Sequence, residues 1–499
     1  MKKIVLSLTF LVASLCTSFG QDENDAIRYG FTTYMGTARG MAIGSALGSV
    51  GGDFGALSIN PAGIGIYRKG EFSFTPSFNI HNNSGTYKGS STSSSDSKLN
   101  FSQVGIVLTK SENEYTGRHR WKTASFAVGV NRQQNFFNRY SYSGKNNQNS
   151  IVNKWANDFN ALGGLNQTTL GIVNFPAYAA YETYLIDRDS TDSTKAMSYV
   201  PLEGDGLQQT KTVSESGHMQ EIVISGGGNY MDKLLVGATL GIVTTKFNRN
   251  TQYNEDDLSG NLNNDFSYLK FSETLNTEGT GFNLKLGLIY KFNKNFRLGF
   301  AVHTPTWIEL TDQSRIFMES NTEKLLQGSS ITTFNQDTAL AFNYSMTTPY
   351  RALASGTVLF NRYGFLTADI EYVDYSSMKY NFGASYETLS SALNTSIQNT
   401  FRPVTNLRIG GELKIEDIAL RAGFAYYGSP YENASWDASQ QNITFGIGYR
   451  AKSWFMDLAY IYSQCENFEN PYILDNGNSP LASVKRTNSH AALTVGWKF

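Results

Sequence analysis

GTARGMAIGSALGSVGGDFGALSINPAGIGI, residues 36–66, is the stretch that decides the fold. It carries only two charged residues, Arg39 and Asp53. Its small side chains bury little apolar area for each residue that has to be ordered. Such a segment is either a mobile N-terminal arm or is ordered because another part of the protein encloses it. The rest of the chain decides between these two possibilities.

From Glu71 to the last residue, apolar and polar side chains alternate repeatedly. In residues 282–292, Phe, Leu and Tyr side chains alternate with Asn, Lys and Gly, and residues 296–302 repeat the pattern after a short turn. A period of two predicts β-strands with one apolar face. The abundance of Tyr, Phe and Gly, without long apolar runs, also favours many strands.

The connections between these strands fall into two classes of length, six mostly short and seven mostly long, which gives fourteen strands. Short turns on one side and long loops on the other are typical of outer-membrane barrels, whereas a soluble β-sandwich would not sort its loops by side. We therefore predict an all-β membrane protein, a 14-stranded antiparallel transmembrane β-barrel with long extracellular loops. The predicted long loops are residues 81–98, 132–216, 249–266, 311–337, 378–400, 429–440 and 465–484; two Ser/Asn-rich tracts, 89–98 and 144–150, are predicted to be solvated loop.

Both ends of the chain support export. Residues 1–20 have the basic start, apolar stretch and small-residue cleavage site of a signal peptide that is removed after Gly20. The alternating last strand places Trp497 and the terminal Phe499 on one face, which resembles the signal that the outer-membrane barrel-assembly machinery recognises. These features predict the outer membrane of a Gram-negative-type bacterium.

A barrel of fourteen strands is too wide for its wall side chains to fill. We expect residues 21–70 to form a hatch inside the lumen of the barrel, residues 71–499. Gly residues allow close approach and tight turns, and Pro61 restricts the residue before it, so that Asn60, Pro61 and Ala62 form a fixed corner where the hatch passes into the first strand. The candidate hatch residues are Arg39, Asp53, Asn60, Pro61 and Ala62.

Several charged residues are predicted to face the lumen. Pairing across the turn at residues 415–417 places Glu412 opposite Arg421 and Gly410 opposite Gly423, which leaves a hollow in the wall. The charges are either solvated lumen residues, whose pairs contribute roughly 0–1 kcal/mol, or they gate or hold the hatch. The candidate lumen charges are Asp369, Glu371, Arg408, Glu412 and Arg421.

The segment 132–216 is too long for a plain connection. Within it, Ile151 and three later apolar residues share one helical face, and a second apolar helix can begin at Pro176. Two helices over the barrel mouth either form an apolar groove that binds a ligand or pack on each other as a lid without one. The candidate ligand-binding residues are Trp155, Phe159, Leu162, Phe175, Tyr178 and Tyr181.

The sequence resembles the FadL/TodX family of outer-membrane transporters for long-chain fatty acids and aromatic hydrocarbons. The resemblance covers essentially the mature chain and implies a hatch, a hydrophobic groove among the outer loops, passive uptake and lateral release through a kinked wall strand. The family's Asn-Pro-Ala motif maps to Asn60, Pro61 and Ala62, but its fatty-acid-binding residues do not map one by one. The resemblance rests on five segments: residues 36–65, YKFNKNFRLGFAVHTPT (290–306), TPYRALASGTVLF (348–360), LTADIEYVDYSSM (366–378) and NLRIGGELKIEDIALRAGFAYYGSPY (406–431).

We therefore predict passive transport of hydrophobic small molecules, such as long-chain fatty acids or aromatic hydrocarbons, with capture by apolar loops and release by hatch rearrangement. An alternative is a structural or interaction protein that serves a secretion or surface-attachment machinery, because a fold does not settle a function. A hydrolase around His490 is a third possibility, but no nucleophile-elbow spacing is present and we expect no enzyme activity.

The composition limits the partners. The net charge of −1 argues against nucleic acid. Cys465 is the only cysteine left after signal removal, so no cysteine metal site can form, and we expect no metal or cofactor. The expected partners are the lipid bilayer, a hydrophobic ligand and the barrel-assembly machinery.

Overall fold

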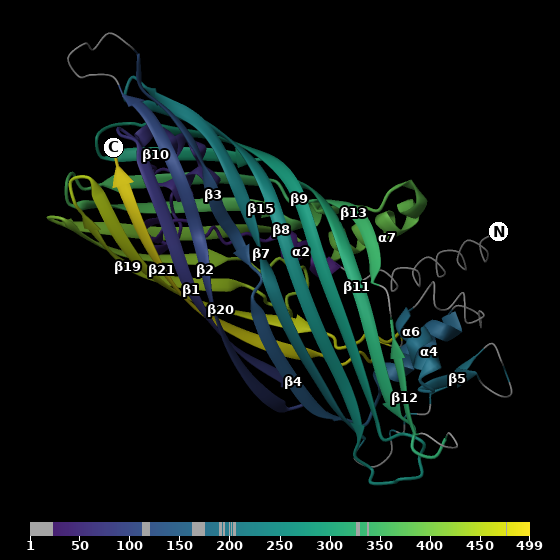
Figure 1. The fold of residues 1–499 in the computed structure, drawn as a ribbon. Helices are drawn as coiled ribbons and strands as arrows, with labels where there is room; N and C mark the ends of the chain where they lie inside the picture. The colour runs from purple at the N-terminus through teal and green to yellow at the C-terminus, as the bar shows by residue number, and fades with distance from the viewer. Residues whose placement is uncertain are drawn as a thin grey trace.

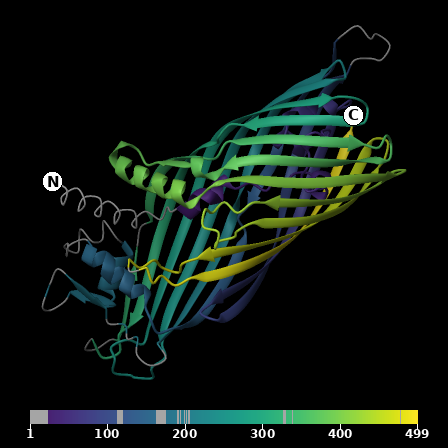
Figure 2. The ribbon, with the colours of Figure 1, turned by 180° about the vertical axis from the view of Figure 1, so that it is seen from behind.

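The computed structural model describes residues 23–111, 120–161, 175–188, 192, 195–198, 200, 202, 206–325, 330–336, 339–475 and 477–499. Over this range the chain forms a closed antiparallel β-barrel with its N-terminal segment inside, as Figures 1 and 2 show from opposite sides. Among the described helices, none has the length and apolar character needed to cross a bilayer. The predicted fold, a 14-stranded barrel with an internal hatch, is confirmed.

The wall is a ring in which neighbours in sequence pair, and β1 closes it by pairing with both β2 and β21. Four of the fourteen strands are interrupted and carry two labels each: β3 with β4, β10 with β11, β13 with β14, and β15 with β16. The wall strands are β1 Glu71–Tyr87, β2 Ser90–Ser111, β3 Trp121–Asn135, β4 Asn138–Asn146, β7 Leu207–Tyr230, β8 Leu234–Asp257, β9 Tyr268–Lys291, β10 Phe296–His303, β11 Trp307–Asn321, β13 Leu340–Thr347, β14 Arg351–Leu359, β15 Gly364–Asp374, β16 Lys379–Asn381, β17 Pro403–Ile415, β18 Ile418–Tyr427, β19 Gln440–Arg450, β20 Trp454–Glu469 and β21 Ala482–Lys498.

The remaining elements lie in the lumen or at the outer end. Three short strands complete the outer end: β12 Ile331–Asn335 pairs with β11, and β5 Ile186–Arg188 pairs with β6 Ala196–Ser198. The helices are α2 Glu23–Gly30, α3 Ala38–Ala42, α4 Ile151–Ala161, α6 Phe175–Glu182 and α7 Glu387–Thr400, and the 3-10 helices are η1 Phe54–Ser58, η2 Pro61–Ile66, η3 Tyr375–Ser377 and η4 Ala384–Tyr386.

The strands are much longer than a bilayer requires, and this corrects the predicted loops. β7, β8 and β9 have 24 residues each, which corresponds to ~80 Å of strand against ~30 Å of hydrocarbon. The Ser-rich tract 89–98 is therefore not a loop, because β2 begins at Ser90 and pairs with β1 along its length. Likewise, residues 132–216 are not one loop, since they contain β4 and the start of β7. Beyond the bilayer both faces of a strand are polar, so the period-two signal disappears.

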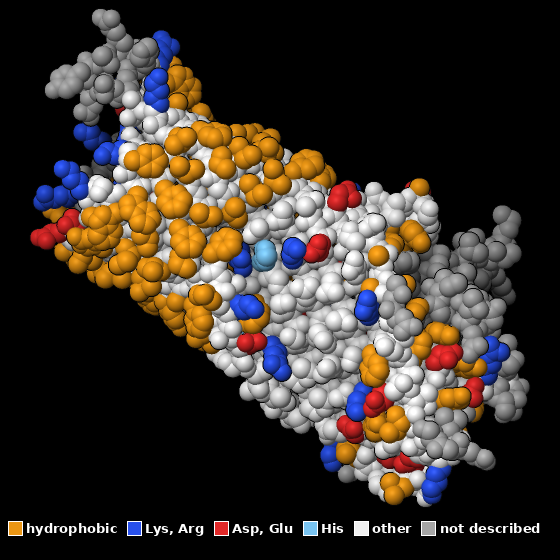
Figure 3. Space-filling model, in the orientation of Figure 1, with side chains coloured by type: hydrophobic (Ala, Val, Ile, Leu, Met, Phe, Trp, Pro, Cys, Tyr) orange, Lys and Arg blue, Asp and Glu red, His pale blue; other side chains and the backbone are white. Residues whose placement is uncertain are grey.

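Exposed apolar side chains form a belt at the end of the barrel that carries the short turns and the C-terminus, and Figure 3 shows this belt on one face. Along β9 and the residue after it, the belt runs from Phe282 to Phe292, with Leu286 near the middle and 49% exposed. Trp497 is also exposed and stacks on Phe72 at 6.1 Å between ring centroids. Exposed apolar side chains in a continuous belt with aromatic residues at its edge face lipid.

The hatch fills the lumen at the level of this belt. All residues from 36 to 66 are buried except Arg39, Gly52 and Ile66, which are partly buried. The hatch joins the wall at Gly70, whose carbonyl oxygen accepts a hydrogen bond from the backbone N of Phe499 at 3.0 Å. The first of the two possibilities for the glycine-rich stretch, a mobile arm, is therefore wrong.

The belt predicts a position-dependent effect of charge on β9. Leu286→Arg is expected to lower the free energy of unfolding by about 2–4 kcal/mol, because arginine would lie in hydrocarbon. Asn276→Arg, on the same outward face but beyond the belt, should change it by less than about 0.5 kcal/mol. Urea unfolding in lipid vesicles, followed by tryptophan fluorescence, measures both; equal losses would contradict the assigned bilayer position.

Candidate functional site

Side-chain caps order the short helices of the hatch. The Thr37 hydroxyl accepts from the backbone N of Gly40 at 3.1 Å, at the start of α3, and donates to the Asp53 carboxylate at 2.7 Å. Asp53 in turn accepts from the backbone N of Gly55 at 2.9 Å and begins η1. Helices this short are not stable alone, so caps and enclosure hold them.

Asn60 fixes the hatch to the wall. Its amide oxygen accepts from the backbone N of Ala62 at 3.1 Å, and its amide nitrogen donates to the carbonyl oxygen of Gly48 at 2.6 Å and, across to the wall, to those of Leu288 and Phe300, both at 3.3 Å. The predicted corner thus lies inside the barrel, against β9 and β10. It starts η2, with Pro61 as the first residue, rather than leading directly into β1.

Glycines on the wall receive the backbone of the hatch. The predicted pairing of Gly410 with Gly423 is confirmed, and the hollow between them is filled by Ile43 and Gly44 of the hatch. A Cβ atom at either wall glycine would overlap the backbone of these two residues. The same register places Glu412 opposite Arg421, as expected.

One buried charge network joins the hatch to the wall. The Arg39 guanidinium lies 3.3 Å from the Glu412 carboxylate and 3.7 Å from Asp53. Glu412 also accepts from Arg421 at 2.7 Å, and Arg421 donates to Asp457 at 2.7 Å. The hatch supplies two of these five residues, Arg39 and Asp53. Through Arg39 it is tied electrostatically to Glu412 of β17.

A second network lies on β14, β15 and β17. Arg408 is 3.2 Å from Glu371 and 3.7 Å from Asp369, and Arg351 is 3.0 Å from Glu371. Asp369 accepts from the backbone N of Gly48 in the hatch at 3.0 Å. The alternative that the lumen charges are solvated is wrong, because Asp369, Glu371, Arg408, Glu412 and Arg421 are all at most 5% exposed. Because the hatch excludes water from these charges, the roughly 0–1 kcal/mol that an exposed pair contributes does not apply to them.

The predicted ligand-binding residues lie at the outer end, in an apolar cluster that we call the outer cluster. Trp155 and Phe159 on α4 are each 2% exposed, and Trp155 packs edge-on against Phe271 of β9 at 5.4 Å. Phe175 and Tyr178 of α6 pack against Phe334 of β12, and Tyr181 also borders the cluster. Leu162 lies outside the described residues. Five of the six predicted residues therefore lie in one cluster, but as packed side chains rather than as the walls of an open groove.

Sequence reasoning missed the residue that holds α4 in place. The buried Glu255 carboxylate of β8 accepts from the backbone N of Ile151 at 3.0 Å and from Gln209 at 2.8 Å, and it bonds Ser150. Burial and the negative charge of Glu255 raise the pKa of the nearby Tyr472 phenol above its ordinary value, so this phenol stays neutral. The carboxylate binds the N-terminus of α4, where the helix dipole favours it.

A second apolar cluster, the mouth cluster, lies between the outer cluster and the hatch. It includes Tyr29 of α2, Phe136, Met219, Tyr344 and Phe382, together with one face of α7. The sequence analysis treated residues 378–400 as loop. The recurrence of Leu389, Leu393 and Ile397 at every fourth position is the helical signal that could have found α7.

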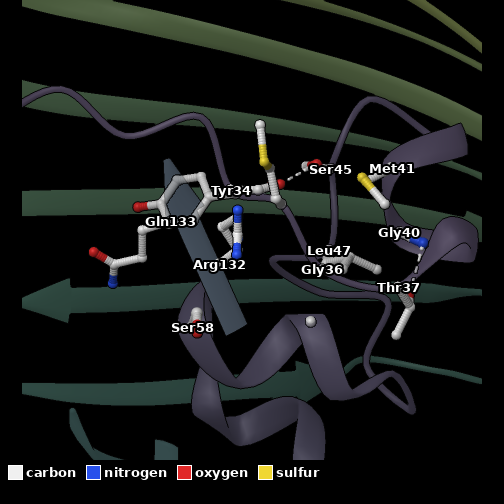
Figure 4. Close-up of a pocket in the computed structure, with 12 residues that line it drawn as sticks. Tyr34, Gly36, Thr37, Gly40, Met41, Ser45, Leu47, Ser58, Arg132 and Gln133 are labelled. Carbon is white, nitrogen blue, oxygen red and sulfur yellow. Dashed lines mark hydrogen bonds between the residues drawn. The ribbon is translucent and has the colours of Figure 1, made fainter. Parts of the chain in front are cut away.

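The wall is irregular at β3. The register with β7 shifts between Arg132 and Gln134, and the strand is interrupted before β4. Beside this bulge lies a pocket between wall and hatch, which Figure 4 shows; its lining includes Tyr34, Met41 and Leu47 of the hatch and Arg132 and Gln133 of β3. Among the described residues, no group of three or more His, Cys, Asp or Glu side chains is placed to hold a metal.

Several solved structures have a similar fold. The structure of a FadL homologue from Pseudomonas aeruginosa is 15% identical and aligns with 94% of this chain and 100% of its own, with a TM-score of 0.56. The P. putida toluene transporter TodX is 14% identical over 94% and 99% of the two chains (TM-score 0.55), and the Ralstonia pickettii toluene transporter TbuX is 15% identical over the same shares (TM-score 0.50). At such identities these likenesses establish the fold alone. Comparison with curated proteins gives no match.

The family assignment comes from the sequence. The profile of the family described as "Outer membrane protein transport protein (OMPP1/FadL/TodX)" matches residues 209–473, which is more than half of the chain. The resemblance found in the sequence is thereby confirmed. The chain belongs to the OMPP1/FadL/TodX family of outer-membrane transport proteins.

Proposed function

We propose that this protein carries hydrophobic small molecules passively across the outer membrane. The observation that supports this most directly is the order of its surfaces: an apolar outer cluster, an apolar mouth cluster and then a pocket between hatch and wall. The printed descriptions of the similar structures name toluene transporters and a FadL homologue, which is consistent with such a ligand. Long-chain fatty acids and aromatic hydrocarbons are the two substrate classes that we propose.

We assign capture to the outer cluster. Its aromatic side chains lie beyond the apolar belt, where a ligand first arrives, and α4 and α6 cover it. Because Trp155 and Phe159 are buried, a ligand enters by displacing side chains of the two helices rather than by settling on an open surface. In this scheme the two helices packed as a lid are the resting state, and α4 and α6 move when a ligand enters.

We assign release to the hatch and the β3 bulge. The hatch fills the lumen around Gly44 and Pro61, so axial passage requires it to leave its glycine contacts. We assign the exit through the wall to the side of the barrel at Arg132 and Gln133, where a pocket lies between hatch and β3. In this scheme, residues 21–70 are the hatch and residues 71–499 the barrel, and a ligand that binds more tightly to the opened state shifts the hatch toward it.

Disturbing the outer cluster should slow uptake. Trp155→Asp places a carboxylate among Phe271 and the other apolar side chains of the cluster, and we expect uptake of a fatty acid or of toluene into proteoliposomes to fall several-fold. Tyr184→Asp, on an exposed residue next to α6, is the matched control and should leave uptake unchanged. Normal uptake by a correctly folded Trp155→Asp protein would exclude the outer cluster from the path.

Loosening the hatch should make the barrel leak. Arg39→Ala removes one partner from a buried pair, which costs on the order of 3–5 kcal/mol where burial is complete and less here, since Arg39 is partly exposed. The barrel keeps its own Glu412–Arg421 pair, so the cost falls on hatch docking. We expect ion conductance in planar bilayers to rise. Arg68→Ala, which breaks an exposed pair with Asp232, should not raise it, and equal conductance of both variants would contradict the proposed latch.

A further inference from the structure

Exposed Lys and Arg side chains surround the end of the barrel that carries the short turns, and we call this set the basic rim. Among the described residues at this end, ten exposed basic side chains compare with three exposed acidic ones, Asp232, Glu416 and Asp417. Figure 3 shows Lys and Arg side chains beside the apolar belt there, on the face in view. The basic rim consists of Arg68, Lys69, Lys110, Arg120, Lys233, Lys294, Arg362, Lys414, Lys452 and Lys498.

Most cations of the basic rim have no acidic partner. Arg68 and Lys414 each lie within 3.5 Å of a carboxylate, whereas the other eight have no carboxylate within ion-pair distance among the described residues. An exposed lysine on the wall nearer the loops is placed differently, since Lys246 of β8 lies 2.8 Å from Glu278 of β9. The described part of the protein therefore leaves an excess of positive charge at the basic rim.

The cations are spread around the barrel and are not gathered on one side. Five of the six short connections between wall strands carry one, at Arg120, Lys233, Lys294, Arg362 and Lys452. Because the wall is a closed ring of strands, these turns follow one another around its circumference. A globular protein docked beside the barrel would contact one side, whereas a bilayer leaflet contacts every side. The distribution therefore favours lipid as the partner.

The basic rim directly borders the belt that faces lipid. Exposed aromatic rings lie at this edge of the belt, at Trp121, Trp454 and Trp497, which are 52%, 39% and 49% exposed. The Arg362 guanidinium lies 5.3 Å from the ring centroid of its neighbour Tyr363. Aromatic side chains at the edge of a belt mark the level of the lipid head groups, and a Lys or Arg beside them can place its charge among those head groups.

We propose that the basic rim binds the head groups of anionic phospholipids in the periplasmic leaflet of the outer membrane. Short turns mark the periplasmic side of such barrels, so the rim and these head groups lie at the same level. A phospholipid with a net negative charge is attracted to unpaired surface cations, and a zwitterionic one of the same size is attracted far less. The inference is independent of the proposed transport, because it concerns the outer surface of the barrel and no ligand path.

The test measures which phospholipid contacts the barrel at the rim. Bromine atoms on acyl chains quench the fluorescence of tryptophans that touch them, and Trp121, Trp454 and Trp497 border the rim. Trp307, which contacts Phe282 at the other edge of the belt, is changed to Phe in every protein compared. The full chain is placed in vesicles of brominated phosphatidylglycerol with unbrominated phosphatidylcholine, and in the reverse mixture. The two quenching values give the relative affinity for the two lipids.

We expect the parent protein to prefer phosphatidylglycerol by at least about threefold, and 1 M NaCl to reduce this preference, because the screening length falls from about 10 Å to about 3 Å. A rim variant that lacks the five turn cations should keep less than about half of the preference. The rim variant combines Arg120→Gln, Lys233→Gln, Lys294→Gln, Arg362→Gln and Lys452→Gln.

A matched control removes five exposed cations at the loop end of the barrel and changes the net charge by the same amount. We expect it to retain the parental preference, and heat-modifiable migration on gels confirms that each variant is folded. The control variant combines Lys88→Gln, Lys145→Gln, Lys195→Gln, Lys324→Gln and Lys379→Gln.

Three results would overturn the inference. The first is a parent protein without preference for phosphatidylglycerol, and the second is an unchanged preference in the folded rim variant. The third is an equal loss in the rim and control variants, which would show an effect of net charge alone. If the parent shows no lipid preference but binds soluble polyglutamate, and the rim variant does not, the basic rim instead serves an acidic protein.

Discussion

The structure depends on one constraint: a polypeptide that closes a wide barrel must find a partner for each of its own backbone polar groups, because the lumen around it holds little water. The hatch meets this constraint by bringing its backbone against the wall. Its carbonyl oxygens at Ile43, Gly48 and Pro61 lie where a Cβ of a wall residue would be, and each of these wall positions is a glycine: Gly410, Gly299 and Gly237, respectively. The glycines that matter for docking are thus on the strands as well as in the hatch.

The buried charges follow from the same exclusion of water. Once the hatch is docked, the carboxylates of Glu412 and Glu371 have no access to solvent, and each is held by two arginines. An unpaired buried carboxylate would cost several kcal/mol, so these pairs make barrel closure and hatch docking depend on each other. Arg39 takes part from the hatch side. The hatch is consequently part of the electrostatic balance of the wall and not only a steric plug.

The architecture could be read from the sequence because a bilayer imposes a simple pattern. Alternation within the belt, the sorting of connections and the glycine-rich start gave the strand number, the hatch and the Glu412–Arg421 register. Strand ends outside the bilayer could not be read, since Ser90 and its neighbours are polar on both faces. The candidate site could be predicted only in part. Helical periodicity indicated Trp155. The burial of Arg132 could not be predicted, because alternation alone would place this residue on the lipid side and the β3 bulge interrupts the alternation there.

Three irregularities of the wall lie around one cavity. β10 gives way to β11 at residues 304–306, and β14 is separated from β13 at residues 348–350; Pro305 and Pro349, which cannot donate to a sheet, lie in these two breaks. A polar cavity under α2 is lined by Gly30, Gln133, Thr304 and Pro349, and therefore touches both breaks and the β3 bulge. Regular strands would keep one cross-section from end to end. Three departures around a single cavity instead change the wall where the chain passes from α2 into the hatch. The wall therefore departs from regular pairing at the level where it meets the start of the hatch.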